Sequence, residues 1–260
     1  MDQTASRYGT VGKGDLHIHT ARGDGMADIP ELLAYVEGET DLSVIAITEH
    51  DDLSVAHEAR EQCARGRYRF QVVVGVEITT LGGHLLALFL EEPVPSLQPL
   101  RPTLEGVHQK GGLCIIPHPM SWLTRSIGRS TIERVLGEGR DGVYFDGIET
   151  ANMSPGARVS IEKARRLNDH HYHLAAIGGS DAHFLTVIGS SYTLFPGSTP
   201  EDLRRAILQR TTSVGNGRYP SLAQIGLGQV VRQTWRGMTA TPRKMGWGRT
   251  VWSFIRRVTP

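Results

Sequence analysis

The chain has 260 residues, with 28 Lys and Arg against 27 Asp and Glu, so its formal net charge is +1. This length suits a single α/β barrel and can bury a core without disulfide bonds. Cys63 and Cys114 have neither zinc-site nor disulfide-framework spacing, and Cys114 lies in an apolar run, which favours a buried thiol. No apolar signal segment or membrane-spanning run is visible, so a cytoplasmic protein is expected.

Charge divides the chain into two unequal parts. Residues 221–260 contain seven basic and no acidic residues (+7), whereas residues 1–220 contain 21 basic and 27 acidic residues (−6). We therefore predict a barrel domain over 1–220 and a basic tail over 221–260. Arg alternates with Trp over 246–258, which suits a nucleic-acid backbone or an anionic membrane surface. The alternative is a tail that packs on the barrel.

Apolar runs alternate with amphipathic stretches along the body. Strands are expected at 16–19, 43–48, 71–78, 84–90, 113–117, 147–150, 174–178 and 191–195. Helices are expected at 29–37, 54–65, 100–110, 131–136, 157–168 and 200–210, with Asp28, Ser54 and either Ser198 or Thr199 as caps. A helix over 221–240 is weakened by Gly226, Gly228 and Gly237. The alternation predicts βα units, a mostly parallel sheet and a hairpin around 81–83.

Histidine and acidic residues gather at the ends of the expected strands. They are Asp15, His17, His19, Glu49, His50, Asp51, Glu77, His118, Glu149, Asp181 and His183. The carboxyl ends of barrel strands meet at one face, and alternation along a strand places the pairs 17/19 and 181/183 on the same side. Imidazole with carboxylate suits Zn²⁺, Mn²⁺ or Fe²⁺, and two bridged ions can clamp a displacement at phosphorus.

Chance must be weighed against this interpretation, because a single HxH or DxH motif is a weak signal. Six histidines share the strand-end position: His17, His19, His50, His84, His118 and His183. The other five, which we expect to be solvated on helices or loops, are His57, His108, His170, His171 and His173. The shared position of the first six favours a metal cluster.

Six segments carry a family resemblance: DLHIHTARGDG, AITEHDD, GVEITT, GGHLLALFL, IIPHP and GGSDAHFLTVIG. In this order, over about residues 14–195, they resemble the PHP (polymerase and histidinol phosphatase) family. The resemblance implies a distorted (β/α)₇ barrel with two or three divalent ions of Mn, Fe or Zn. It is closest to small stand-alone members that act on nucleotide or nucleic-acid phosphates.

The resemblance also implies particular ligands. The first ion would be held by His17, His19, Glu77 and Asp181; the second by His84, His118 and the bridging Glu77; the third by Asp24, His50 and His183. Glu49 stands where the family more often has Asp and would orient His50. Glu149 occupies a position that is often acidic in the family, without being a firm ligand.

The reaction implied is hydrolysis of a phosphate ester by a metal-bridging hydroxide, with Asp24 or His183 protonating the leaving group. Arg125, Arg129 and Arg158 follow strand ends and could bind the phosphate, although a solvated arginine is an equally good interpretation of each.

Three alternatives remain open. Histidinol phosphate is a second substrate class beside nucleotides and oligonucleotides. A metal-dependent deacylase of the amidohydrolase type usually has a strand-borne lysine, whereas Lys13, Lys110 and Lys163 lie away from strand ends. A regulatory metal-binding module without activity is disfavoured, because every expected ligand is present.

Overall fold

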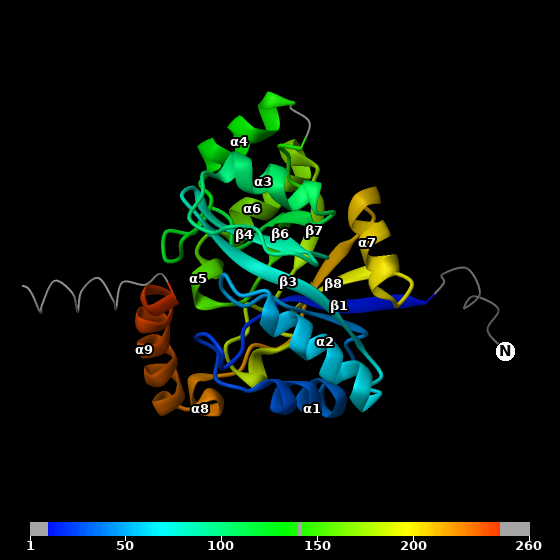
Figure 1. Ribbon diagram of the computed structural model, residues 1–260, viewed down its shortest axis with the longest axis vertical. Helices are drawn as coiled ribbons and strands as arrows, with labels where there is room; N and C mark the ends of the chain where they lie inside the picture. The colour runs from blue at the N-terminus through cyan, green and yellow to red at the C-terminus, as the bar shows by residue number, and fades with distance from the viewer. Residues whose placement is uncertain (1–9, 140–141, 245–260) are drawn as a thin grey trace, which may run out of the picture.

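The computed structural model describes residues 10–139 and 142–244, so the Arg and Trp side chains over 246–258 lie outside the described residues. A single sheet of nine strands, in the order β7-β6-β5-β4-β3-β2-β1-β8-β9, curves into a nearly closed barrel (Figure 1). The strands are β1 Val11–Ile18, β2 Val44–Ile47, β3 Gln71–Thr80, β4 Gly83–Leu88, β5 Leu113–Ile116, β6 Gly147–Ala151, β7 Ala175–Gly178, β8 Ser191–Pro196 and β9 Ser213–Asn216. This confirms the expected α/β barrel.

The barrel closes between β7 and its neighbours across the seam, β1 and β8. Thr193 Oγ1 on β8 accepts from Gly178 N at 2.8 Å and donates to Gly178 O at 3.0 Å. Beyond β7, Ala182 O accepts from His19 N at 2.9 Å. The seam therefore brings the two ends of the sheet together beside the candidate ligands of β1.

Strand direction departs from the predicted, mostly parallel sheet. The pairs β1–β2, β2–β3, β5–β6 and β6–β7 are parallel, whereas β3–β4, β4–β5, β1–β8 and β8–β9 are antiparallel. The two-residue link Leu81–Gly82 permits only a hairpin, because a parallel connection needs a crossover of a dozen or more residues. Strand β9 was not predicted, since its four residues SVGN are short and partly polar.

Helices surround the sheet (Figure 1). They are α1 Ile29–Glu39, α2 Ser54–Gly66, α3 Leu100–Gln109, α4 Arg129–Glu138, α5 Pro155–Arg158, α6 Ile161–Leu167, α7 Pro200–Gln209, α8 Leu222–Ile225 and α9 Leu227–Lys244. Asp28 and Thr199 each form a capping box, as their sequence positions predict. Ser54 is not the cap of α2; Leu53 holds that position, and Ser54 instead donates to Asp52 Oδ1 at 2.5 Å.

The single helix expected over 157–168 is wrong. The chain forms α5, breaks at Ser160, continues as α6 and ends in a π-helical turn, Asn168–Tyr172. Ser160 Oγ donates to Pro119 O at 2.8 Å, which ties this break to the loop after β5. The break positions Arg158 and Ser154 beside that loop.

Two apolar clusters leave one end of the barrel for polar side chains. The interior cluster joins Leu16, Val73 and Ile177 of the strands to Leu203 and Ile207 of α7. Helix α7 therefore packs against this interior cluster, and Figure 1 shows it beside β8 and β1. The second cluster joins the outward strand faces to the surrounding helices. At about 25 cal/mol per Å² of buried apolar surface, such clusters are the main stabilising contribution to the barrel.

The C-terminal segment has two helices rather than one. Gly226, at φ +91°, separates α8 from α9. Ile225 is buried, Val230 packs against the core, and Arg236 Nη1 donates to Gly25 O at 2.8 Å. The described part of the predicted tail thus contacts the barrel, while the domain boundary at residue 220 stays a prediction. No helix within 10–139 and 142–244 is long and apolar enough to cross a membrane.

Candidate metal centre

Six histidines and three carboxylates converge at one end of the barrel, where the parallel strands have their carboxyl ends and the antiparallel β4, which carries His84, has its amino end. They are His17, His19, His50, His84, His118, His183, Asp24, Glu77 and Asp181. His17 and His19 have fully buried side chains, whereas those of His50 and His84 are each 14% exposed and that of His183 is 17% exposed. The cluster therefore has a buried floor and an open rim.

Glu77 lies at the middle of this cluster, and its two oxygens face different histidines. Oε1 lies 2.9 Å from both His84 Nδ1 and His118 Nε2. Oε2 lies 3.1 Å from His50 Nδ1 and within 3.5 Å of the Nε2 atoms of His17 and His19. This arrangement allows one carboxylate to bridge two metal ions.

Asp181 completes the buried side of the cluster. Its Oδ1 atom lies 3.5 Å from His17 Nε2 and 3.4 Å from His19 Nε2, and those two nitrogens are 3.1 Å apart. Two imidazole nitrogens and a carboxylate oxygen converging at such distances could supply three ligands of a tetrahedral or octahedral metal site.

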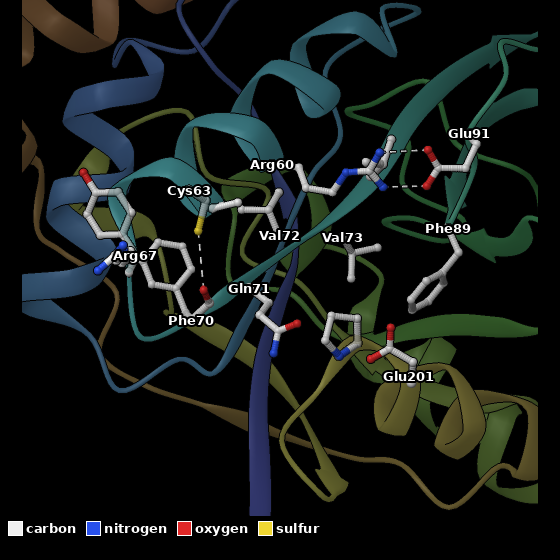
Figure 2. Close-up of a pocket in the computed structure, with 14 residues that line it drawn as sticks. Arg60, Cys63, Arg67, Phe70, Gln71, Val72, Val73, Phe89, Glu91 and Glu201 are labelled. Atoms are coloured by element: carbon white, nitrogen blue, oxygen red, sulfur yellow. Dashed lines mark hydrogen bonds and ion pairs between the residues drawn. The ribbon is translucent and has the colours of Figure 1, made fainter.

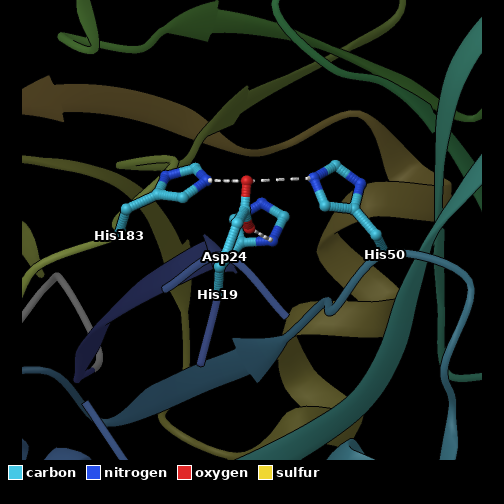
Figure 3. Close-up of side chains that lie close together, drawn as sticks. All are labelled: His19, Asp24, His50 and His183. Atoms are coloured by element: carbon cyan, nitrogen blue, oxygen red, sulfur yellow. Dashed lines mark ion pairs between the residues drawn. The ribbon is translucent and has the colours of Figure 1, made fainter. Parts of the chain in front are cut away.

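Asp24 gathers a further group with His19, His50 and His183, shown in Figure 3. Its Oδ2 atom lies 3.2 Å from His183 Nε2 and 3.8 Å from His50 Nε2. Among the described residues, no hydrogen-bond partner reaches His19 Nδ1 or Asp24 Oδ1, which are buried and 3.8 Å apart. Buried polar atoms are normally satisfied. Their separation, too long for a hydrogen bond, fits two ligands of a shared cation.

The backbone adopts uncommon conformations at two of these residues. Asp181 has φ +53° and His118 has φ +28°. Such conformations are a few times more frequent for Asp and His than for other side chains, and they are concentrated at functional sites. Asp181 and His183 lie in the loop beyond β7. The turn therefore brings them together, whereas we had predicted that alternation along a strand would do so.

Two further carboxylates hold the histidines in place. Glu149 Oε1 lies 2.8 Å from His17 Nδ1, and its Oε2 accepts from His118 N at 2.6 Å. Glu49 accepts from His50 N at 3.0 Å and lies 3.6 Å from His19 Nδ1. The contact of Glu149 with the His17 ring can fix the tautomer and orientation of that ring. The hydrogen bond of Glu49 holds the backbone of His50.

Asp15 has a structural role that the sequence analysis did not identify. Its fully buried carboxylate accepts from Ser180 Oγ at 2.5 Å, Ser180 N at 2.9 Å and Gly189 N at 2.8 Å. Burial raises the pKa of Asp15 to about 6, although these hydrogen bonds oppose the shift. Asp15 thus joins β1 to the loop that carries Asp181. Its position two residues before His17 is the signal that could have revealed it.

The three candidate arginines have different surroundings. Arg158 lies beside Asp181 and His183 in the lining of one cleft. Arg125 lies next to His84, whose N–H donates to Arg125 O at 2.7 Å. Arg129 Nε donates to Glu133 at 2.7 Å on the exposed side of α4, which favours a helix-surface role.

His108 is not solvated, contrary to our expectation. Its Nδ1 lies 3.0 Å from Gly142 O and its Nε2 lies 3.0 Å from Asp146 Oδ2, while Tyr144 stacks on the ring. Asp146 also accepts from Cys114 N at 2.7 Å. With both nitrogens already hydrogen-bonded, this group links α3 to the start of β6 and has no open ligand position. Cys114 itself is a free, buried thiol, as expected.

The electrostatics of the cluster favour positive charge. Burial lowers the pKa of His17, but Asp181, Glu149 and Glu77 more than offset it, so the pKa lies well above its usual value. Burial would raise the pKa of Glu77, yet the surrounding histidines hold it well below its usual range. Metal ions and protons therefore compete for the same ligand atoms, and the affinity for metal should decrease as the pH is lowered.

Among the clefts formed by the described residues, two differ in their relation to the metal cluster. One, of about 640 Å³, includes Asp181 and His183 and extends to residues 219–234. The other, of about 380 Å³, lies between α2 and the start of β3 (Figure 2). Its polar contacts, the Arg60–Glu91 ion pair and the 3.4 Å contact of Cys63 Sγ with Phe70 O, are internal to the fold. Only the larger of these two clefts includes candidate metal ligands.

Comparison with known proteins agrees with this geometry. A family model described as PHP-associated matches residues 162–212. An uncharacterized protein from Methanocaldococcus jannaschii is 31% identical over 150 residues, which cover 54% of this chain and 81% of that protein. The 5′-3′ exoribonuclease Rnm of Salmonella typhimurium is 32% identical over 88 residues. The match covers 32% of this chain and 30% of that enzyme.

The fold has counterparts among crystal structures. A two-domain protein from Bacteroides vulgatus, containing a predicted PHP-like metal-dependent phosphoesterase, superposes with a TM-score of 0.62 at 22% identity. The superposition covers 80% of this chain and 65% of that protein, so the chain spans less than two thirds of its length. With the sequence match to the archaeal protein over most of its length, these comparisons show that the chain belongs to the PHP family.

Proposed function

We propose that the protein is a metal-dependent phosphoesterase that hydrolyses nucleotide or oligonucleotide phosphate esters. The observation that carries this proposal is the position of Glu77, one oxygen of which faces His84 and His118 while the other faces His17 and His19. A bridging carboxylate between two sets of imidazoles is suited to paired divalent ions, and paired ions are suited to displacement at phosphorus.

The proposed ligands form three overlapping groups: His17, His19, Glu77 and Asp181; His84, His118 and Glu77; and Asp24, His50 and His183. Nitrogen and oxygen donors in this mixture suit Mn²⁺, Fe²⁺ or Zn²⁺. Burial lowers the pKa of His50 to about 4, so its ring is neutral and able to act as a ligand near neutral pH.

When bound, divalent ions would supply Lewis-acid charge and a nucleophilic water at neutral pH. The chain contributes the remaining groups. His183 Nε2 and Asp24 Oδ2, 3.2 Å apart at the rim, can hold a proton for the leaving oxygen if two ions are bound, or act as ligands if three are bound. Arg158, on the same cleft, is placed to bind phosphate oxygens.

Two observations support this choice over the alternatives. The similarity to the exoribonuclease Rnm favours nucleic-acid or nucleotide phosphates over histidinol phosphate. A deacylase with a metal-bridging lysine is disfavoured, because Lys13 pairs with Asp41 and Lys110 pairs with Glu92, away from the cluster. Two buried free cysteines accord with the reducing cytoplasm as the proposed location.

The experiment is a hydrolysis assay of metal-loaded protein on AMP, a short oligoribonucleotide, histidinol phosphate and an N-acyl amino acid. We expect phosphate or nucleotide release, abolished in a His17→Ala/His19→Ala variant and retained in His57→Ala, whose histidine lies outside the cluster. Equal rates in all three proteins would assign the activity to a contaminant. Hydrolysis of the N-acyl substrate alone would favour the deacylase.

We also propose that the basic tail contacts an anionic membrane surface. Leu227, Val231 and Trp235 recur every four residues on α9 and are 71%, 63% and 67% exposed. Residues 221–260 add a charge of +7 without any acidic residue. An exposed apolar stripe combined with basic charge is typical of a helix lying at a membrane interface. Nucleic-acid contact, the other tail interpretation, does not require that stripe.

A further inference from the structure

The cleft beside the metal cluster is lined by both polar and apolar side chains. The polar ones include Asp181, His183 and Arg158. Ser154 Oγ donates to Asp181 Oδ2 at 3.1 Å, and Arg158 forms no ion pair with any carboxylate in the part of the chain that the structure describes. Arg158 is therefore available for a phosphate group.

The apolar lining of the cleft comes from the loop after β7 and from the C-terminal segment. Phe184, Val187, Tyr219, Ile225 and Val230 all line it. Val187 and Ile225 are buried, and Phe184, Tyr219 and Val230 are partly buried against the main core. Two aromatic rings with aliphatic neighbours form a surface to which a flat apolar group can bind.

The C-terminal wall of the cleft is attached to the loop that carries Asp24. Arg236 Nη1 donates to Gly25 O at 2.8 Å. A Cβ atom placed on Gly237 would lie 3.4 Å from Asp24 Oδ2, so α9 passes close to the cluster. The wall is therefore held at a fixed distance from the candidate ligands and can select substrates by shape.

We propose that residues 219–234, with Phe184, form a subsite for an aromatic ring in the alcohol part of the phosphate ester, and that Tyr219 contacts that ring. This inference rests on the proposed phosphoesterase function. The phosphate binds beside Asp181 and Arg158, and the ring of the alcohol part packs against Tyr219 and Phe184 in the same cleft. A cleft of about 640 Å³ is large enough for an ester of this kind.

The test uses two esters with similar leaving alcohols, 2-phenylethyl phosphate and ethyl phosphate, on the same metal-loaded preparation. We expect wild-type kcat/KM to be about tenfold or more higher for the phenyl compound. Tyr219→Ala should lower that preference about tenfold, mainly through the KM of the phenyl compound. Tyr219→Phe, which keeps the ring, should retain the preference. The ratio of two substrates does not depend on the folded fraction of the preparation.

The outcomes separate the subsite from the proposed function. Equal kcat/KM for the two esters in the wild type, or an equal loss for both in Tyr219→Ala, would overturn the subsite while the phosphoesterase stands. If neither ester is hydrolysed with any metal, the assay on AMP and the oligoribonucleotide judges the proposed function, which fails if those are not hydrolysed either. Calorimetric binding of both esters then decides the subsite: tighter binding of the phenyl compound, lost in Tyr219→Ala, supports it, and equal binding refutes it.

Discussion

His17 Nδ1 lies 2.8 Å from Glu149 Oε1, and both side chains are fully buried. Glu149 Oε2 accepts from His118 N and from Asn152 Nδ2, so the carboxylate is surrounded by donors. The contact therefore places the His17 proton on Nδ1 and leaves Nε2 free to bind a metal ion. The first prediction follows from this tautomer.

Glu149→Gln should weaken metal binding about 10–100-fold, the usual cost of losing such a carboxylate partner. The glutamine oxygen would turn to the two N–H donors and its NH₂ group would face His17 Nδ1, which moves the proton to Nε2. The measurement is a calorimetric titration with Mn²⁺ and Zn²⁺. Glu162→Gln, which alters only an exposed pair with Arg165, is the matched control. Unchanged affinity in Glu149→Gln would contradict the positioning role.

Metal stoichiometry tests the ligand groups. Asp24→Ala removes the carboxylate that joins His183 and His50, so it should reduce the number of bound ions by one if a third site exists. Glu77→Ala removes the carboxylate proposed to bridge two ions, so it should reduce the number of bound ions further. Elemental analysis after dialysis gives the count, and a melting curve reports folding. If Asp24→Ala retains the wild-type number, the site holds two ions and Asp24 remains available for proton transfer.

The His108–Asp146 contact gives a pH-dependent stability. Burial lowers the pKa of His108, but hydrogen bonds to Asp146 and Gly142 O outweigh it, and the pKa is raised above 6.5. When the pKa of a histidine is higher in the folded than in the unfolded state, its charge stabilises the folded state. This stabilisation is complete at pH values below the pKa of the unfolded state and is lost as the pH rises through the pKa of the folded state. His108→Gln should therefore lower the free energy of unfolding at pH 5.5 by about 1–2 kcal/mol.

The same substitution should have a smaller effect at pH 9, where His108 is neutral in both states. Urea denaturation at the two pH values measures the difference. His170→Gln, at an exposed histidine of the π-helical turn Asn168–Tyr172, provides the control. An equal loss at both pH values would show that His108 acts through packing against Tyr144 instead of through its charge.

The exposed stripe of α9 can be tested separately from the cleft. Leu227→Ser/Val231→Ser should weaken binding to vesicles containing phosphatidylserine, because both side chains are exposed and apolar. Gln229→Ser, on the same helix, should not. Binding should also weaken with added salt if the arginines contribute. Unchanged vesicle binding, together with salt-sensitive binding to a single-stranded oligonucleotide, would show that the tail contacts nucleic acid instead of a membrane.

The sequence by itself determined the features that depend on short-range pattern. Apolar runs located the strands β1 to β8, and Asp28 and Thr199 cap their helices as their neighbours predict. The positions of five histidines at the carboxyl ends of strands implied convergence, because these ends share one face of a barrel. His84 instead lies at the start of β4 and reaches that face because β4 runs antiparallel to β3. The resemblance of the PHP motifs supplied the α/β barrel, which the structure confirms.

Only the tertiary structure decided which groups touch. The pairing of His17 with Glu149 spans 132 positions, and that of Asp15 with Ser180 spans 165, so no local pattern encodes either contact. His108 seemed solvated because its partner Asp146 lies 38 residues away on another element. The sequence also could not predict that α9 runs along the cleft. An amphipathic pattern shows that a helix has an apolar face, but it does not show which surface that face contacts.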